Sequence, residues 1–203
     1  MQTDGYPTNW QHYDSYVIHV GADQFGFQGS NGDVNRFGAR FRAAAKFEGV
    51  LLGGYAQSTI AGYSALCRVL FVWSAFESFM SICGLEQRTV GPLLDRHGAL
   101  AVANDIRASD KGNAFYQFIQ ERVNAAHRTE LQNYFNQDPC NVAYLASAIR
   151  HIFAHGSLTP NANQVEPATV VIVCNKLSDF LLRVMDREFG GRVATGLEDL
   201  HGH

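Results

Sequence analysis

Apolar side chains recur at positions three and four apart through most of the chain from residue 36 to residue 190. This spacing is the periodicity of amphipathic helices. The 57–83 segment is apolar on all sides, which is typical of a helix central in its domain or shared with a partner chain. The fold class that we predict is all-α, a helical bundle over residues 36–190. After a first helical stretch from residue 36, the predicted helices cover 57–83, 90–107, 113–123, 129–135, 142–155 and 166–189.

The two ends of the chain differ from this helical body. Residues 1–35 are rich in Gly, Asn, Asp, Tyr and Phe, and the 21–32 segment carries several turn signals. Residues 16–20 have the character of a short strand, so we expect an irregular or short-β N-terminal arm lying on the body. Gly190 and Gly191 are expected to close the last helix and to leave residues 191–203 as a loose tail.

The composition is that of a globular domain. The chain has 203 residues, of which 46% are hydrophobic and 17% charged, so it is long enough to bury a sizeable core. Its net charge of −3 gives no overall basic footprint for nucleic acid. A local phosphate-binding patch is still an alternative, because nearly all of the basic residues are Arg, which binds phosphate through two parallel hydrogen bonds.

The sequence carries no signal of secretion or membrane insertion. The first residues form neither a basic nor an apolar leader, and no run of about eighteen uncharged apolar residues is present. None of the cysteines belongs to a Cys-x-x-Cys pair, so we expect free thiols in a reducing, cytoplasmic setting. We also expect no cofactor, because the glycines at 21–32 and 53–54 lack the spacing of a phosphate-binding loop.

Arg150, His151 and His155 are the main candidates for chemistry. His151 and His155 are four residues apart and share one face of the helix predicted over 142–155, with Arg150 beside them. A histidine exchanges protons at cellular pH. An adjacent arginine holds a phosphate and stabilises charge that develops during its reaction. The group suits phosphodiester chemistry without a metal, although cations in the last turn of a helix also complement its dipole.

Glu77 is a carboxylate within the most apolar predicted helix. A carboxylate is costly to bury unless it is paired. One hypothesis is that Glu77 supports the site by orienting Arg150 or His155. The alternative is that Glu77 reaches solvent or a structural arginine such as Arg68 or Arg107.

Two further groupings have weaker functional interpretations. His151 and His155 have the spacing of a helical metal pair, but no nearby cysteine or carboxylate completes the set, so we expect no metal site. Arg183, Arg187 and Arg192 line up near the end of the last predicted helix. They are expected either to track an RNA backbone or, more simply, to form a solvated face.

The order Arg150, a polar residue (His151), three further positions and then His155 resembles the signature of the HEPN superfamily. In that family an Arg is followed by a polar residue, and a His lies four to six residues beyond the Arg. The context is similar too, because the motif ends a helix and is followed by a loop, 156–163, and a long amphipathic final helix. An earlier long helix with an aromatic and acidic core, here residues 69–80, completes the likeness.

The resemblance covers roughly residues 55–190 and implies a HEPN-like helical bundle. It further implies a metal-independent endoribonuclease, often toxin-like, that acts as a homodimer with both motifs facing a shared cleft. Carried over by position, His155 is the acid–base residue for the 2′-hydroxyl or the leaving oxygen. Arg150 binds the scissile phosphate, and His151 orients it or adds a polar contact. The implied partners are RNA, a second copy of the chain and a protein antitoxin, and the implied product is a 2′,3′-cyclic phosphate.

Two alternatives accompany this interpretation. Many HEPN domains bind a nucleotide, a nucleic acid or a protein partner without cleaving anything. A purely structural helical protein is the third hypothesis, and it requires the patch from Arg150 to His155 to be buried and internally satisfied. Ser157 stands where a subgroup silenced by a partner nucleotidyltransferase has Tyr, so control by tyrosine modification is not expected there.

Overall fold

The computed structural model describes residues 4–138, 140–161 and 165–201. Within these ranges the chain is helical and contains no strand, so the all-α fold class is confirmed. The α-helices are α1 (Trp10–Val20), α2 (Asn31–Lys46), α3 (Gln57–Ile82), α4 (Gly91–Arg96), α5 (Ala99–Ser109), α6 (Ala114–Gln120), α7 (Ala125–Asn136), α8 (Ala143–Ala154) and α9 (Pro167–His201). Two short 3-10 turns, η1 (Asp23–Phe25) and η2 (Lys111–Asn113), lie between them.

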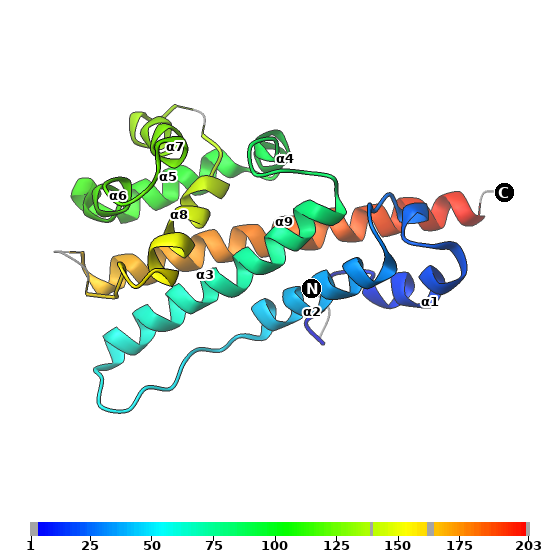
Figure 1. The fold of residues 1–203 in the computed structure, drawn as a ribbon, viewed down its shortest axis with the longest axis horizontal. Coiled ribbons are helices and arrows are strands. Elements are labelled where there is room, and N and C mark those ends of the chain that lie inside the picture. The colour runs from blue at the N-terminus through cyan, green and yellow to red at the C-terminus, as the bar shows by residue number, and fades with distance from the viewer. Residues whose placement is uncertain (1–3, 139, 162–164, 202–203) are drawn as a thin grey trace.

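Helices α3 and α9 form the centre of the molecule. They pack against each other over much of their length. Helices α1 and α2 lie toward one end of this pair, and α4 to α8 gather toward the other, as Figure 1 shows. Fully buried aromatic side chains from both helices, Phe76 and Phe79 of α3 and Phe180 of α9, lie in the core. Because α3 packs against α2, α8 and α9, its apolar residues have neighbours on several sides, which explains their distribution around the helix.

Helix α3 is also long and apolar enough to cross a membrane by length and composition alone. However, 61% of its most apolar window is buried inside the molecule. The core that α3 builds therefore accounts for its apolar character, as in a soluble protein.

The N-terminal segment is helical, and the prediction of a strand at residues 16–20 is wrong. Trp10, Tyr13 and Val17 are buried, at the three- and four-residue spacing of a helix, whereas Ile18 is 74% exposed. The next helix, α2, begins at Asn31 rather than at residue 36. Its start is set by a capping box, in which the Ser30 hydroxyl accepts from the Asp33 backbone N–H and the Asp33 carboxylate accepts from the Ser30 backbone N–H.

The last helix does not stop at Gly190 and Gly191, so the prediction of a loose tail is wrong as far as His201. Helix α9 continues through both glycines. Gly190 and Gly196 serve close packing instead: a Cβ at Gly190 would lie 3.2 Å from Thr8, and one at Gly196 would lie 2.7 Å from the Phe25 ring. The N-terminal segment therefore lies directly against the backbone of α9 along its last turns.

The region predicted as one helix over 90–107 is two. Helix α4 ends at Arg96, and Gly98 adopts a φ of 88° before α5 begins. This left-handed conformation is readily available to glycine and interrupts the helix. All four cysteines are free thiols, with Cys83 and Cys174 buried.

Gly38 is where α1 docks on α2, and we expect Gly38→Ala to lower the free energy of unfolding by about 1–3 kcal/mol, the usual cost of overpacking. A Cβ at this position would overlap the Trp10 ring. That ring cannot yield easily, because it stacks between Tyr6 and Phe189 at centroid distances of 4.9 and 5.5 Å. Urea denaturation of the two proteins measures the difference.

Gly191→Ala is the matched control. Gly191 lies inside α9 with no atom within 4 Å of an added Cβ. Its replacement should raise stability by roughly 0.5–1 kcal/mol, through helix propensity alone. Equal effects of the two substitutions would show that Trp10 does not pack against Gly38 in solution.

Candidate functional site

The predicted motif lies at the end of α8, and the turn that follows is well defined. His155 is the first residue after the helix, and Gly156 adopts a φ of 73°. The Gly156 N–H donates to the Phe153 carbonyl and the Ser157 N–H to the Ile152 carbonyl, both at 2.9 Å. This pair of bonds is a Schellman motif, which uses up carbonyl groups of the last turn. The backbone at His155 is therefore held in place.

The candidate side chains point away from the core. Ile149 and Ile152 bury the inner face of α8. Arg150 lies on the outer side with its side chain 40% exposed, and His151 and His155 are exposed. The two imidazole rings have a centroid distance of 4.4 Å. The purely structural hypothesis requires a buried, internally satisfied patch, and the observed exposure counts against it.

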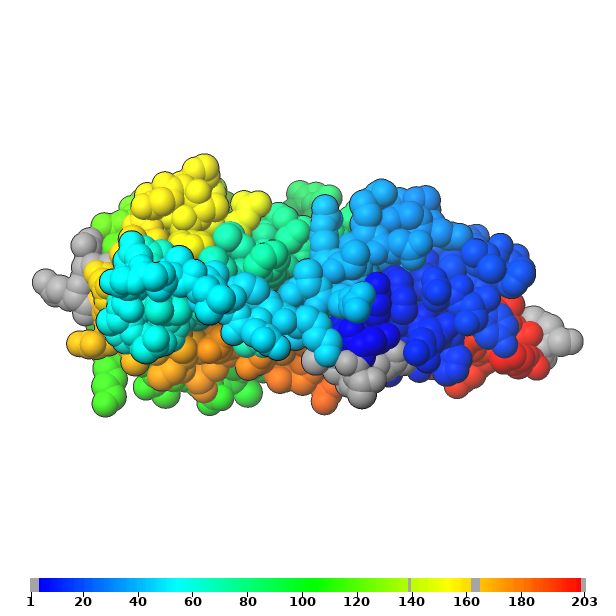
Figure 2. Space-filling model, turned by 90° about the horizontal axis from the view of Figure 1, so that it is seen from below, coloured from blue at the N-terminus to red at the C-terminus, as the bar shows by residue number. Residues whose placement is uncertain are grey.

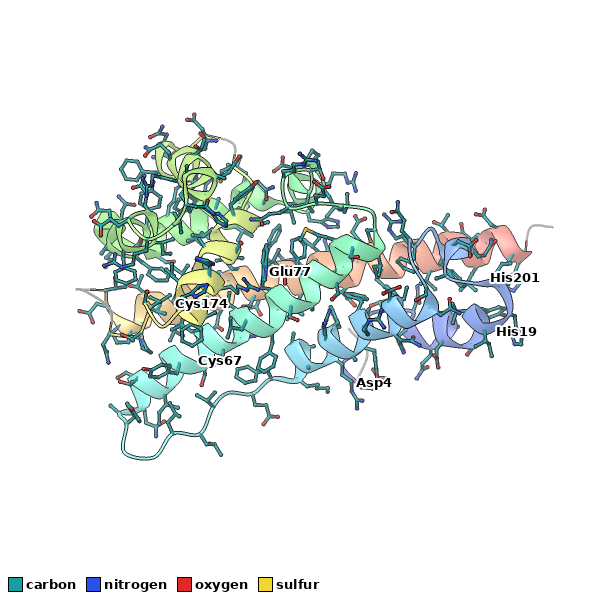
Figure 3. The ribbon with its side chains drawn as sticks, in the orientation of Figure 1. Asp4, His19, Cys67, Glu77, Cys174 and His201 are labelled. Atoms are coloured by element: carbon teal, nitrogen blue, oxygen red, sulfur yellow. The ribbon has the colours of Figure 1, made fainter. Side chains whose placement is uncertain are left out.

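Glu77 projects from α3 (Figure 3), and its carboxylate lies near Arg150 of this patch. Its Oε2 lies 4.0 Å from an Arg150 guanidinium nitrogen, and the two side chains are 49% and 40% exposed. Arg68 and Arg107 are instead engaged elsewhere, Arg68 with Asp179 at 2.6 Å and Arg107 with the Tyr134 carbonyl at 2.5 Å. An ion pair this exposed contributes about 0–1 kcal/mol. The contact can orient Arg150, but it is too weak to keep the guanidinium from a ligand.

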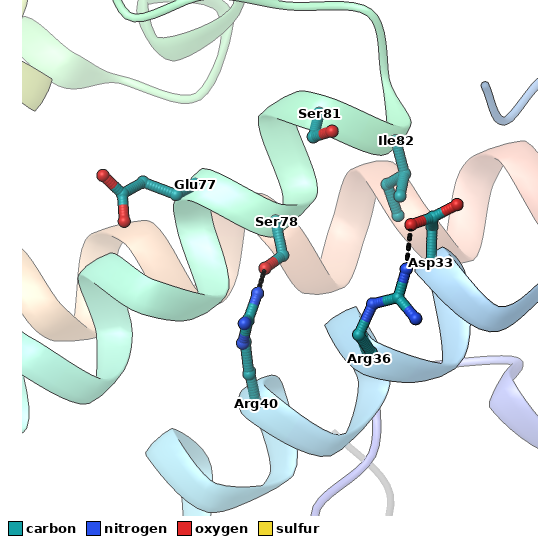
Figure 4. A pocket seen from close by; sticks show the side chains of 7 residues that line it. All are labelled: Asp33, Arg36, Arg40, Glu77, Ser78, Ser81 and Ile82. Carbon is teal, nitrogen blue, oxygen red and sulfur yellow. Dashed lines mark hydrogen bonds and ion pairs between the residues drawn. The ribbon is translucent and has the colours of Figure 1, made fainter. Parts of the chain in front are cut away.

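A small cavity of about 200 Å³ adjoins Glu77 between α2 and α3 (Figure 4). Arg40 donates a hydrogen bond to the Ser78 hydroxyl, and Arg36 pairs with Asp33. The charged side chains that line the cavity are two arginines and two carboxylates, so their formal charges cancel. By charge, this cavity does not select an anion.

His127 is a neighbour of the motif that sequence reasoning missed. Its Nδ1 lies 3.0 Å from Asn124 Oδ1, which also accepts the His127 backbone N–H as the cap of α7. An amide oxygen can only accept, which assigns the ring proton to Nδ1. The other ring nitrogen, Nε2, then accepts from the Ser147 hydroxyl at 3.0 Å. Ser147 precedes His151 by one turn of α8, so the bond ties α7 to the motif helix.

The order Ser147, His127, Asn124 is that of a hydrolytic triad, but its setting is different. Ser147 is only 8% exposed and lies inside α8, so its hydroxyl is not offered to a substrate. Burial, and secondarily the electrostatic effect of the nearby His151 side chain, hold the pKa of His127 below its ordinary value of 6.5. His127 therefore acts as a neutral structural contact between α7 and α8.

The three arginines of the last helix are not gathered at the motif. Arg192 donates to the Gly26 carbonyl at 2.6 Å, and Arg187 and Arg192 line a cavity with the η1 turn. Arg183 instead borders a separate hollow beside Arg68. Among the residues that the structure describes, no group of three or more His, Cys, Asp or Glu side chains is placed to hold a metal ion.

We expect the free energy of unfolding to decrease as the pH falls below 6.5, partly through His127. Above this pH the ring is neutral in both the folded and the unfolded state. The contacts of the neutral His127 ring then make their full contribution to the free energy of unfolding. Below it the unfolded chain takes up a proton that the folded protein resists, until the pH passes the folded-state pKa. His127→Gln should therefore flatten the pH dependence measured by urea denaturation. Parallel curves for both proteins would contradict the contact.

Comparison of the chain with protein-family models, with curated proteins and with solved structures finds no match in any of the three. A functional proposal therefore has to be argued from the side chains themselves. The residues that carry it are Arg150, His151 and His155 at the end of α8, with Glu77 beside Arg150.

Proposed function

We propose that this protein is a metal-independent endoribonuclease of HEPN type that cleaves RNA by 2′-hydroxyl attack. One observation carries the proposal: a solvent-accessible Arg150, His151 and His155 cluster at the capped end of α8. The long helix α9, which follows after a loop, and the central α3 support it further, because they fit the arrangement that the HEPN resemblance implies.

The proposed reaction uses the two kinds of side chain in different ways. His155 takes the proton of the 2′-hydroxyl, and the 2′-oxygen attacks the phosphorus. The guanidinium of Arg150 binds the phosphoryl oxygens and stabilises the charge that develops on them. The bond from phosphorus to the 5′-oxygen breaks, and this oxygen takes a proton from a second imidazolium. The products are a 2′,3′-cyclic phosphate and a 5′-hydroxyl.

A homodimer supplies the second imidazolium in this proposal. Two copies of the motif facing one cleft bring together two His155 side chains, one as base and one as acid. His151, whose ring contacts that of His155, orients the phosphate or adds a polar contact. Glu77 holds Arg150 in position from α3. The cellular role that we propose is that of a cytoplasmic toxin or defence nuclease controlled by a protein antitoxin.

The second candidate function is a non-catalytic HEPN module that binds a nucleotide, a nucleic acid or a protein partner. Exposed apolar side chains favour it: Leu51, in the loop before α3, is fully exposed, and Phe71, in the middle of α3, is 43% exposed. Apolar side chains left in solvent are available to a partner's surface, and a contiguous patch of them marks an interaction site. The two candidates differ in whether RNA that binds is also cut.

We expect Arg150→Ala and His155→Ala to abolish cleavage of single-stranded RNA by the full-length protein in the presence of EDTA. Loss of an acid–base residue lowers kcat by about 100- to 10,000-fold. The assay separates products on a denaturing gel and identifies the cyclic phosphate by mass spectrometry. Arg88→Ala is a matched control, because Arg88 is 75% exposed and pairs with Glu86, away from the motif in sequence.

Thermal unfolding of each variant shows whether it is folded. Folded Arg150→Ala and His155→Ala proteins that cut as fast as wild type would refute the nuclease proposal. RNA binding without any product, in wild type and variants alike, would instead support the binding module. Sedimentation of the wild type tests whether it is a dimer. A monomeric protein that still cleaves RNA would exclude an active site shared between two copies.

A further inference from the structure

Three aromatic rings lead from the loop before α3 to the motif at the end of α8. Tyr55 lies just before α3, Tyr63 lies within its second turn, and Phe153 lies in the last turn of α8. The centroid of the Tyr63 ring is 6.2 Å from that of Tyr55 and 6.5 Å from that of Phe153. The rings therefore form a continuous row across two helices, which we call the aromatic row.

The aromatic row is accessible. Tyr55 is 55% exposed, and Tyr63 and Phe153 are half-buried. The segment around the start of α3 and the segment around the end of α8 lie side by side on one face of the molecule, cyan and yellow in Figure 2. A ligand on this face can thus contact ring surfaces from both segments.

The loop after the motif packs against the start of α3, close to Tyr63 in the sequence. Pro160 packs so closely on α3 that a Cβ at Gly62 would lie 2.5 Å from its ring. The Asn161 side-chain amide donates to the Thr59 hydroxyl at 3.4 Å. Tyr63 follows Gly62 directly, so the loop after the motif lies against the same turn of α3 that carries this ring.

A permanently charged side chain borders the aromatic row at its α8 end. Arg150 lies three residues before Phe153, a spacing that makes the two side chains neighbours on the helix surface. A row of rings next to an arginine matches the chemistry of an unpaired nucleic acid, whose bases stack on aromatic faces while its phosphates pair with cations. A duplex keeps its bases stacked on one another and offers only its backbone and groove edges to such a surface.

We propose that Tyr55, Tyr63 and Phe153 form a stacking surface for unpaired bases that flank the phosphate held by Arg150. Single-stranded RNA is therefore the ligand of this face. The inference rests on the proposed function, because the site of the phosphate comes from it. It deepens that function by making substrate choice depend on base stacking rather than on the catalytic side chains.

The test is a fluorescence titration of the full-length protein with a mixed-sequence RNA oligonucleotide that contains 2-aminopurine, whose emission falls when it stacks. The oligonucleotide is 2′-O-methylated, so it cannot undergo 2′-hydroxyl attack and binding is read without cleavage. The same sequence annealed into a duplex is the second probe. The variants are Tyr55→Ala, Tyr63→Leu, Tyr55→Phe and Tyr63→Phe, with Tyr16→Ala as the control, because Tyr16 is 36% exposed on α1.

We expect the wild type to quench the single-stranded probe. Tyr55→Ala and Tyr63→Leu should weaken its binding by roughly 5- to 150-fold each, the range for loss of one base–aromatic stack. Both phenylalanine variants keep the ring and should bind like wild type, as should Tyr16→Ala. Affinity for the duplex should not change in any variant. Tyr55→Ala is the decisive variant if Tyr63→Leu does not fold, because Tyr55 is the more exposed ring.

Unchanged affinity of folded Tyr55→Ala and Tyr63→Leu for the single strand would overturn the proposal. So would a loss of self-association in these variants without an effect on RNA, since the aromatic row would then be a surface between copies. Cleavage of unmodified RNA, measured in parallel, separates the two proposals. Cleavage that depends on His155 with unchanged probe binding removes only the stacking surface, whereas quenching that depends on the rings without cleavage removes only the nuclease.

Discussion

The packing of α3 along α9 is the contact on which the other parts of this structure depend. Phe76, Phe79 and Phe180 are fully buried within the core that the two helices share. Burial of one large aromatic side chain contributes about 1.5–3 kcal/mol, so these three residues together contribute roughly 5–9 kcal/mol to folding. Helix α8 lies against α3, and the inner face of α8 is fixed by the same core. The outer face, with Arg150, is exposed as a consequence.

The helical body could be predicted from sequence because its signal is periodic over long segments. The motif helix was predicted over 142–155 and is observed as Ala143–Ala154. The N-terminal segment was not predictable in the same way. Residues 16–20 contain aromatic and β-branched side chains, which locally favour a strand. Packing of Trp10 and Tyr13 against Phe189, nearly the whole chain away, decides in favour of a helix.

The glycines of α9 show a second limit of local reasoning. A glycine pair after an amphipathic stretch is an ordinary stop signal. Here Gly190 and Gly196 remain inside the helix, because another segment passes too close for a side chain. The distinction between a glycine that ends a helix and one that admits a neighbour depends on that neighbour, which the local sequence does not reveal.

The candidate site also contains residues that local sequence predicts and residues that only the packing of helices brings together. Arg150, His151 and His155 were found from their spacing on one helix, and Glu77 from the cost of a carboxylate in an apolar segment. His127 gave no signal, because it lies 20 residues before Ser147 and only the packing of α7 on α8 joins them. The aromatic row was equally hidden, since its rings come from separate parts of the chain.

The capped turn after α8 also gives the site a direction. The carbonyl groups of Ile152 and Phe153 are occupied by the turn, and that of His151 accepts the His155 N–H at 3.1 Å. The carbonyl ends that remain still carry the negative pole of the helix. An anion that arrives along the axis of α8 meets that pole, whereas one that arrives from the flank meets Arg150 first. The way in which α8 ends therefore favours an anion that approaches from the side of the helix over one that approaches along its axis.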